Sequence, residues 1–217
     1  MPLKVVHVEE SDMADFVRIQ NAAFTTGMAS KLIPKPVTPE RFAKSVNNHL
    51  NSMRNEPDCH FLKVIDTDIN KIISCAKWRI NLEERSEEVV ERSLPKPREP
   101  QPDSCVGAEK DFVTYLANSR RDFMGVKPFY FLHMLITLPE HHRRGAGAML
   151  LKWGLDQADK AQLPSYLEAS DMGRPLYEKL GYRPVKETFF DLSKYGSEGI
   201  ERNTVMLRDP QPVPING

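Results

Sequence analysis

A short stretch rich in glycine and arginine, residues 139–148, most constrains how this chain can fold. It reads Pro-Glu-His-His-Arg-Arg-Gly-Ala-Gly-Ala and separates an apolar run, residues 129–138, from a helical pattern, residues 149–160. A strand, a glycine-rich turn and a helix in this order leave free backbone N–H groups at the helix N-terminus. Those groups, together with the helix dipole, bind phosphate anions. The stretch therefore predicts an anion-binding turn.

The side chains of this turn fit the same interpretation. Gly145 and Gly147 have no Cβ, so the backbone can come close to a ligand. Arg143 and Arg144 add positive charge beside them. A P-loop is excluded because no Lys-Ser or Lys-Thr follows either glycine, and the dinucleotide fingerprint fails because Leu150 stands where its third glycine belongs.

The composition indicates a globular protein without a marked charge preference. The 217 residues are 40% hydrophobic and carry 30 basic and 30 acidic side chains, which gives no support to a nucleic-acid surface. The chain shows neither a signal-peptide pattern nor an apolar run of the roughly 18 residues that a membrane span needs. We therefore expect no nucleic-acid partner and no membrane segment, with the cytoplasm as the default compartment and the nucleus left open.

Three cysteines, Cys59, Cys75 and Cys105, lie far apart and lack the spacing of metal ligands. We interpret them as reduced thiols in a reducing compartment and expect no metal site.

Hydrophobic periodicity divides the chain into alternating strands and helices. The expected strands cover residues 3–8, 61–66, 71–80, 129–138, 165–169, 189–192 and 204–207, and the expected helices start at Ser11 and Thr38 or cover residues 112–123, 145–160 and 175–180. Residues 83–102 are charge-rich and end in four closely spaced prolines, so they cannot form a core strand. We expect an insertion over residues 82–127, formed by this arm and the following helix.

Two motifs in the second half resemble one family. His142-Arg143-Arg144-Gly145-Ala146-Gly147 resembles the signature Gln/Arg-x-x-Gly-x-Gly/Ala, and residues 173–182 resemble Ala-x-x-Leu-Tyr-x-Lys-x-Gly-Phe. One expected strand separates the motifs, as in the GCN5-related N-acetyltransferase (GNAT) superfamily, and fungal members of unassigned substrate look most similar. His142 departs from the usual Gln or Arg, and Ser170 and Gly173 stand where many members have Asn and Ala.

The resemblance implies a single α/β (α+β) domain over residues 1–217, with a mixed, mostly antiparallel central sheet flanked by helices and splayed central strands. It also implies acetyl-CoA as the acyl donor, with the pantetheine arm along Leu135, Ile136 and Thr137. The diphosphate is expected on the turn, and the full set of implied cofactor-binding residues is Leu135, Ile136, Thr137, His142, Arg143, Arg144, Gly145, Ala146, Gly147, Ala148, Ser170 and Tyr177.

Transfer of an acetyl group to an amine needs a proton acceptor for the amine and a proton donor for the leaving thiolate. Tyr177 occupies the family's usual acid position, although an aromatic residue there also serves packing. His133 matches a histidine that takes part in proton removal in the arylalkylamine N-acetyltransferases, and a packed histidine is the alternative. Glu168 is a rival base that a salt bridge can equally explain. Deprotonation through a water chain is a further alternative.

Taken together, the sequence predicts an N-acetyltransferase that moves an acetyl group from acetyl-CoA to a primary amine of a small acceptor. Attack is expected to be direct, in a ternary complex without a covalent acyl-enzyme, by a monomer or homodimer. Two alternatives stay open. The first is a non-catalytic acyl-CoA-binding sensor or interaction module, and the second is an enzyme that uses a longer acyl donor.

Overall fold

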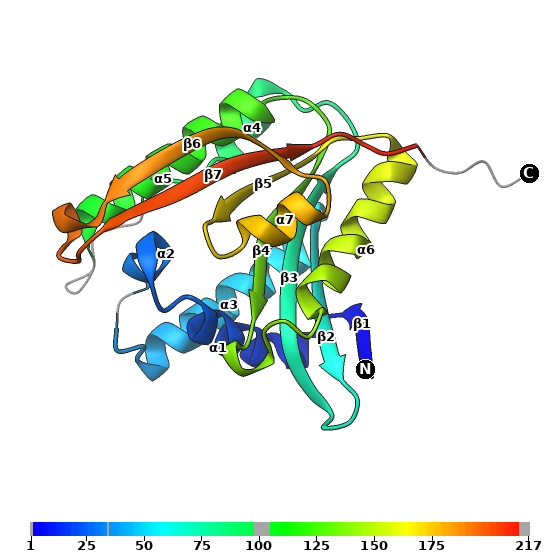
Figure 1. Ribbon diagram of the computed structural model, residues 1–217, viewed down its shortest axis with the longest axis horizontal. Coiled ribbons are helices and arrows are strands. Elements are labelled where there is room, and N and C mark those ends of the chain that lie inside the picture. The colour runs from blue at the N-terminus through cyan, green and yellow to red at the C-terminus, as the bar shows by residue number, and fades with distance from the viewer. Residues whose placement is uncertain (1, 34, 98–104, 213–217) are drawn as a thin grey trace, which may run out of the picture.

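One mixed seven-stranded sheet forms the centre of the protein (Figure 1). The computed structural model describes residues 2–33, 35–97 and 105–212. In chain order the strands are β1 (Leu3–His7), β2 (Cys59–Asp66), β3 (Lys71–Asn81), β4 (Phe129–Thr137), β5 (Ser165–Ser170), β6 (Arg183–Asp191) and β7 (Ile200–Arg208). Their order in the sheet is β1-β2-β3-β4-β5-β7-β6, and every neighbouring pair is antiparallel except β4 and β5. This architecture confirms the predicted fold class.

Helices cover both faces of the sheet. The α-helices are α1 (Met13–Ala23), α2 (Gly27–Lys31), α3 (Pro39–Asn55), α4 (Glu87–Ser93), α5 (Val106–Phe123), α6 (Ala146–Ala161) and α7 (Arg174–Lys179), and the short 3-10 segments are η1 (Glu10–Asp12), η2 (Pro139–His141) and η3 (Leu192–Tyr195). α6 packs in one core cluster, and α1 and α5 pack in clusters on the opposite face.

Local sequence signals explain most of these elements. Thr38 caps α3 by accepting a hydrogen bond from the Arg41 N–H, and a proline follows it at the first helical position. The predicted hairpin forms as β2 and β3. The short helix α2 was not predicted, and β6 is longer than the expected strand at residues 189–192 because its charged, exposed first half carries little hydrophobic signal. Residues 98–104 of the expected insertion lie outside the described residues, so the insertion stays a prediction.

Close packing between α6 and β3 fixes one wall of the core. Trp78 is fully buried, and a Cβ atom added at Gly154 would lie 2.4 Å from the Cζ2 atom of Trp78. The indole N–H of Trp78 points at the carbonyl of Leu150 over 3.4 Å. Only glycine at position 154 therefore lets the helix lie this close to the sheet.

The two central strands separate soon after they meet. β4 pairs with β5 only at Tyr130 with Ser165 and at Phe131 with Tyr166. Beyond this point β4 continues along β3 and β5 continues along β7, so the sheet opens between them. The register of β4 against β3 also shifts, because Trp78 pairs with Leu132 whereas Lys77 pairs with Met134. His133 is thus the extra residue of a β-bulge at the opening.

No helix among the described residues has the length and the apolar character needed to cross a lipid bilayer.

Candidate active site

The glycine turn forms an open cradle of backbone N–H groups before α6. Gly145 is the N-cap residue with φ of 90°, and Arg143 also has a positive φ of 61°. The first N–H that donates back to this cap is that of Met149, to the carbonyl of Gly145 over 3.1 Å. A Cβ atom at Gly145 would meet no atom within 4 Å, so the turn is open on that side. The cradle therefore has the form that binds an anion at a helix N-terminus.

The two arginines of the turn have different surroundings. The Arg144 guanidinium binds Asp66 at the end of β2 over 2.6 Å and the ring nitrogen Nδ1 of His141 over 2.6 Å. The hydrogen bond from Arg144 holds the pKa of Asp66 below its usual range. Arg143 is exposed. Arg144 therefore ties the turn to the sheet, and Arg143 supplies accessible positive charge.

The predicted pantetheine strand borders this cradle. The ring nitrogen Nε2 of His142 lies 3.1 Å from the carbonyl of Thr137, which fixes the turn to the end of β4. A Cβ atom at Gly147 would contact Leu135 at 3.6 Å and Leu176 at 3.4 Å. The edge of β4, the turn and α7 therefore meet around Gly147. Ala146 is buried beneath the turn, and Ala148 is half-buried.

Tyr177 lies on α7 and is buried in the core cluster beneath α6. Burial raises the pKa of its hydroxyl to about 12, so the hydroxyl is protonated at neutral pH. A Cβ atom at Gly173 would lie 2.8 Å from the Tyr177 ring and 3.2 Å from this hydroxyl, so glycine lets the backbone pass close to the ring. Ser170 is exposed, and its hydroxyl accepts a hydrogen bond of 3.3 Å from the N–H of Gly173, which shapes the loop into α7.

His133 lies in the β4 bulge on the face opposite α6. Its ring is 5.3 Å from the ring of Phe131, and its Nδ1 atom is buried without a hydrogen-bond partner among the described residues. Burial lowers the pKa of His133 well below its usual value, and the nearby charges of Arg120 and Lys77 lower it further. The imidazole is therefore neutral at physiological pH and has an unoccupied nitrogen.

Glu168 is engaged by an arginine that sequence reasoning missed. Arg120 on α5 binds both carboxylate oxygens of Glu168, over 2.8 and 3.3 Å, and the hydroxyl of Tyr166 donates to the same carboxylate over 3.0 Å. The guanidinium also stacks 4.7 Å above the ring of Phe131. No spacing pattern links Arg120 to Glu168, because they lie 48 residues apart and meet only in the folded chain.

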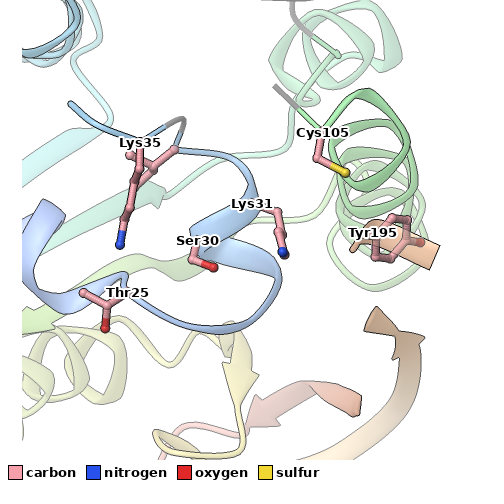
Figure 2. Close-up of a pocket in the computed structure, with 7 residues that line it drawn as sticks. Thr25, Ser30, Lys31, Lys35, Cys105 and Tyr195 are labelled. Carbon is pink, nitrogen blue, oxygen red and sulfur yellow. The ribbon is translucent and has the colours of Figure 1, made fainter. Parts of the chain in front are cut away.

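A separate cavity of about 290 Å³ lies between α2, the start of α5 and η3. Lys31 and Lys35 extend on one side of it, and Cys105 and Tyr195 lie on the other (Figure 2). Its lining residues are Thr25, Ser30, Lys31, Ile33, Lys35, Cys105 and Tyr195. The hydroxyl of Tyr195 donates to Asp111 over 2.6 Å. None of the predicted cofactor-binding residues lines this cavity.

Within the described ranges, no cluster of three His, Cys, Asp or Glu side chains is arranged to hold a metal ion.

The sheet order, the splayed central strands and the glycine turn define an α/β fold of the acetyltransferase type. The model of the acetyltransferase (GNAT) family matches residues 73–182, half of the chain, and the chain belongs to this family.

Three proteins illustrate the likeness. An uncharacterised N-acetyltransferase of Schizosaccharomyces pombe is 39% identical over 86 residues, which are 39% of this chain and 36% of that protein. Arylalkylamine N-acetyltransferase 2 of Aedes aegypti aligns over 97% of this chain and 100% of its own, with a TM-score of 0.68 and 12% identity. The yncA structure of Salmonella typhimurium, solved with its cofactor acetyl-CoA, aligns over 100% of this chain and 99% of its own, with a TM-score of 0.57 and 12% identity. The chain matches about a third of the length of the curated relatives.

Proposed function

We propose that this protein transfers an acetyl group from acetyl-CoA to a primary amine of a small acceptor. The observation that carries the proposal is the open cradle of amides at Gly145, which lies beside the edge of β4 that no strand covers among the described residues. Membership of the acetyltransferase family and the acetyl-CoA bound in the Salmonella structure support it.

In this proposal, residues 143–148 hold the diphosphate of coenzyme A, mainly through backbone N–H groups. The backbone of Leu135, Ile136 and Thr137 then pairs with the amide groups of the pantetheine arm, as a neighbouring strand pairs with a sheet edge. The thioester thereby reaches the opening between β4 and β5, where Tyr177 and His133 approach from opposite faces of the sheet. Binding in fixed positions provides much of the rate enhancement for such a transfer.

The amine nitrogen attacks the thioester carbonyl carbon, and collapse of the tetrahedral intermediate breaks the C–S bond. The neutral imidazole of His133 takes the proton that the amine loses, and the Tyr177 hydroxyl gives a proton to the leaving thiolate. Burial raises the pKa values of Cys59 and Cys75 above that of an ordinary thiol. Because thiols of this kind are poor nucleophiles, direct attack in a ternary complex is favoured over a covalent acyl-enzyme.

Glu168 is the less suitable base because Arg120 and Tyr166 already occupy its carboxylate oxygens. His133→Gln and Glu168→Gln separate the two roles. We expect His133→Gln to lower kcat and to change the pH profile. Glu168→Gln should chiefly lower stability, because it leaves Arg120 without its carboxylate. A larger fall in kcat for Glu168→Gln at unchanged stability would reverse the assignment.

The test of the proposal is consumption of acetyl-CoA with a panel of polyamines, arylalkylamines, amino acids and peptides, together with calorimetric titration of coenzyme A. Gly145→Val should abolish coenzyme A binding in a folded protein. Gly196→Val is the matched control, since Gly196 also has a positive φ, 72°, and open space around it but lies in the loop after η3. Equal coenzyme A affinity in both variants would refute the proposal that the turn at Gly145 holds the diphosphate.

Binding of coenzyme A without turnover of any acceptor would instead favour a non-catalytic acyl-CoA-binding module. A parallel series of longer acyl-CoA donors tests the preference for the acetyl group.

A further inference from the structure

Three lysine and arginine side chains are buried in the described part of the chain, namely Lys63, Lys77 and Arg208, and two of them have a carboxylate partner. Ion pairs join Lys63 to Asp12, Arg120 to Glu168, Arg144 to Asp66 and Arg208 to Asp159. Arg79 binds both Glu56 and Asp58. Such pairing is expected, because a charge buried without a partner is strongly unfavourable.

Lys77 on β3 is the exception. It is only 4% exposed, and within the described part of the chain no carboxylate lies at ion-pair distance from its ammonium group. Its Nζ atom lies 5.0 Å from the centre of the Phe61 ring and interacts with the thiol of Cys59. Glu56 acts on Lys77 from further away, but its carboxylate is bound to Arg79. The charge of Lys77 is therefore not neutralised by the fold.

The position of Lys77 relates it to the proposed reaction. It pairs with Met134, the residue after the β4 bulge, so it lies next to His133. Strand alternation places it on the same face as Cys75, which packs with α1 on the side opposite α6. Arg120, Lys77 and Arg79 act electrostatically on His133 as positive charges. Arg120 and Arg79 are paired with carboxylates, so Lys77 is the charge near the base candidate that has no carboxylate at ion-pair distance among the described residues.

We propose that the acceptor amine also bears a carboxylate, and that Lys77 binds this carboxylate while the amine faces His133. This inference rests on the proposed function and names its substrate class. An α-amino acid or a similar amino acid fits, since its carboxylate supplies the missing counter-charge. Burial lowers the pKa of Lys77, and an incoming carboxylate favours the protonated form again.

Pairs of acceptors that differ only by a carboxylate test the inference, namely lysine with cadaverine, ornithine with putrescine, tyrosine with tyramine and tryptophan with tryptamine. For the pair that fits the site, we expect kcat/KM to favour the carboxylate-bearing member by roughly ten- to a hundredfold, as for a hydrogen bond to a charged group. Lys77→Met should bring this ratio close to one. No preference in any pair, or a ratio unchanged in Lys77→Met, would overturn the inference.

Lys63→Met is the matched control, because Lys63 is a buried lysine of the neighbouring strand β2 with a carboxylate partner. It should lower the melting temperature, since it leaves Asp12 without its cation, and should preserve the acceptor ratio. Lys77→Met should keep or raise the melting temperature, because it removes an unpaired buried charge. A melting temperature that falls as far in Lys77→Met as in Lys63→Met would show that Lys77 is already neutralised, and would overturn the inference.

A failure of the proposed function is distinguishable from a failure of this inference. If no acceptor is acetylated, the proposed function fails, and thermal unfolding with each pair then decides the second question. Stabilisation of the wild type by the carboxylate-bearing member alone, lost in Lys77→Met, supports the carboxylate site. Equal stabilisation by both members, or by neither, contradicts it.

Discussion

The guanidinium of Arg144 lies 2.6 Å from the carboxylate of Asp66, and this ion pair joins the glycine turn to the end of β2. Asp66 is only 2% exposed, so it needs a counter-charge in the folded protein. The sequence motif assigns Arg143 and Arg144 alike to phosphate binding, whereas their surroundings in the structure differ. Arg144 is expected to act on the cofactor by holding the turn in place.

The two arginines should therefore respond differently to the same substitution. Arg143→Gln should weaken coenzyme A binding severalfold, most strongly at low salt, without changing the melting temperature, because it removes only accessible charge. Arg144→Gln should weaken binding and also lower the melting temperature. Calorimetric titration and thermal unfolding measure the two effects. Identical behaviour of the two variants would contradict the division of roles.

Tyr177→Phe should lower kcat by about a hundredfold while leaving the affinity for coenzyme A nearly unchanged, because only the proton donor is lost. Tyr182→Phe is the control, since Tyr182 is also a buried tyrosine of this core and its hydroxyl lies 2.5 Å from Ser165. The control should lower stability by about 1 kcal/mol and keep kcat. Steady-state kinetics decide the point, and an unchanged kcat in Tyr177→Phe would leave this residue a packing role only.

Gly154→Ala should destabilise the fold by about 2 kcal/mol, because the added methyl group would lie 2.4 Å from Trp78 and α6 would have to shift. Gly107→Ala provides a helical comparison. A Cβ atom at Gly107 would meet Tyr195 at an ordinary 3.8 Å, so the better helix propensity of alanine should raise stability by about 0.5 kcal/mol. Urea unfolding measures both, and a neutral Gly154→Ala would mean that Trp78 can move aside.

Stability should fall as the pH drops below about 6.5. Burial lowers the pKa of His49 to about 4, so between these values the unfolded chain binds a proton at this residue that the folded chain does not. The pKa of His133 is also lowered by burial, so this residue changes stability with pH in the same direction. Each histidine adds at most about 1.4 kcal/mol per pH unit to the slope of the unfolding free energy against pH in that window.

His49→Leu should flatten this slope, although it also removes the hydrogen bond of 2.9 Å to Gln20. The control Gln20→Ala removes the same hydrogen bond but keeps the imidazole, so most of the slope should remain. Denaturant unfolding at several pH values between 4 and 7 tests the difference, and equal slopes in His49→Leu and the wild type would refute it.

The resemblance of two motifs to a known family predicted the fold class, and local signals predicted most elements. Thr38 with the proline after it marked the start of α3, and alternation marked the hairpin of β2 and β3. The helix α2 could not be predicted, because five residues are too few to show a periodic pattern. The motifs located the glycine turn and Tyr177, since those depend on residues adjacent in sequence.

The parts of the site that depend on distant pairing could not be predicted in the same way. The bonds of Arg120 to Glu168 and of Arg144 to Asp66 join residues far apart in the chain. No local pattern in the sequence indicates which of its distant residues meet. The unpaired charge of Lys77 becomes visible only when every neighbouring carboxylate has been assigned to another partner. The sequence signal for it was a lysine, Lys77, within an otherwise apolar strand.

Only two residue pairs join β4 to β5, so the sheet consists of two ribbons that share a narrow seam. In the proposed function, the amide groups of a donor molecule along β4 would lie in this gap and add hydrogen bonds at the seam. Occupancy by the donor would then stiffen the join between the two ribbons, which otherwise rests on the shared core.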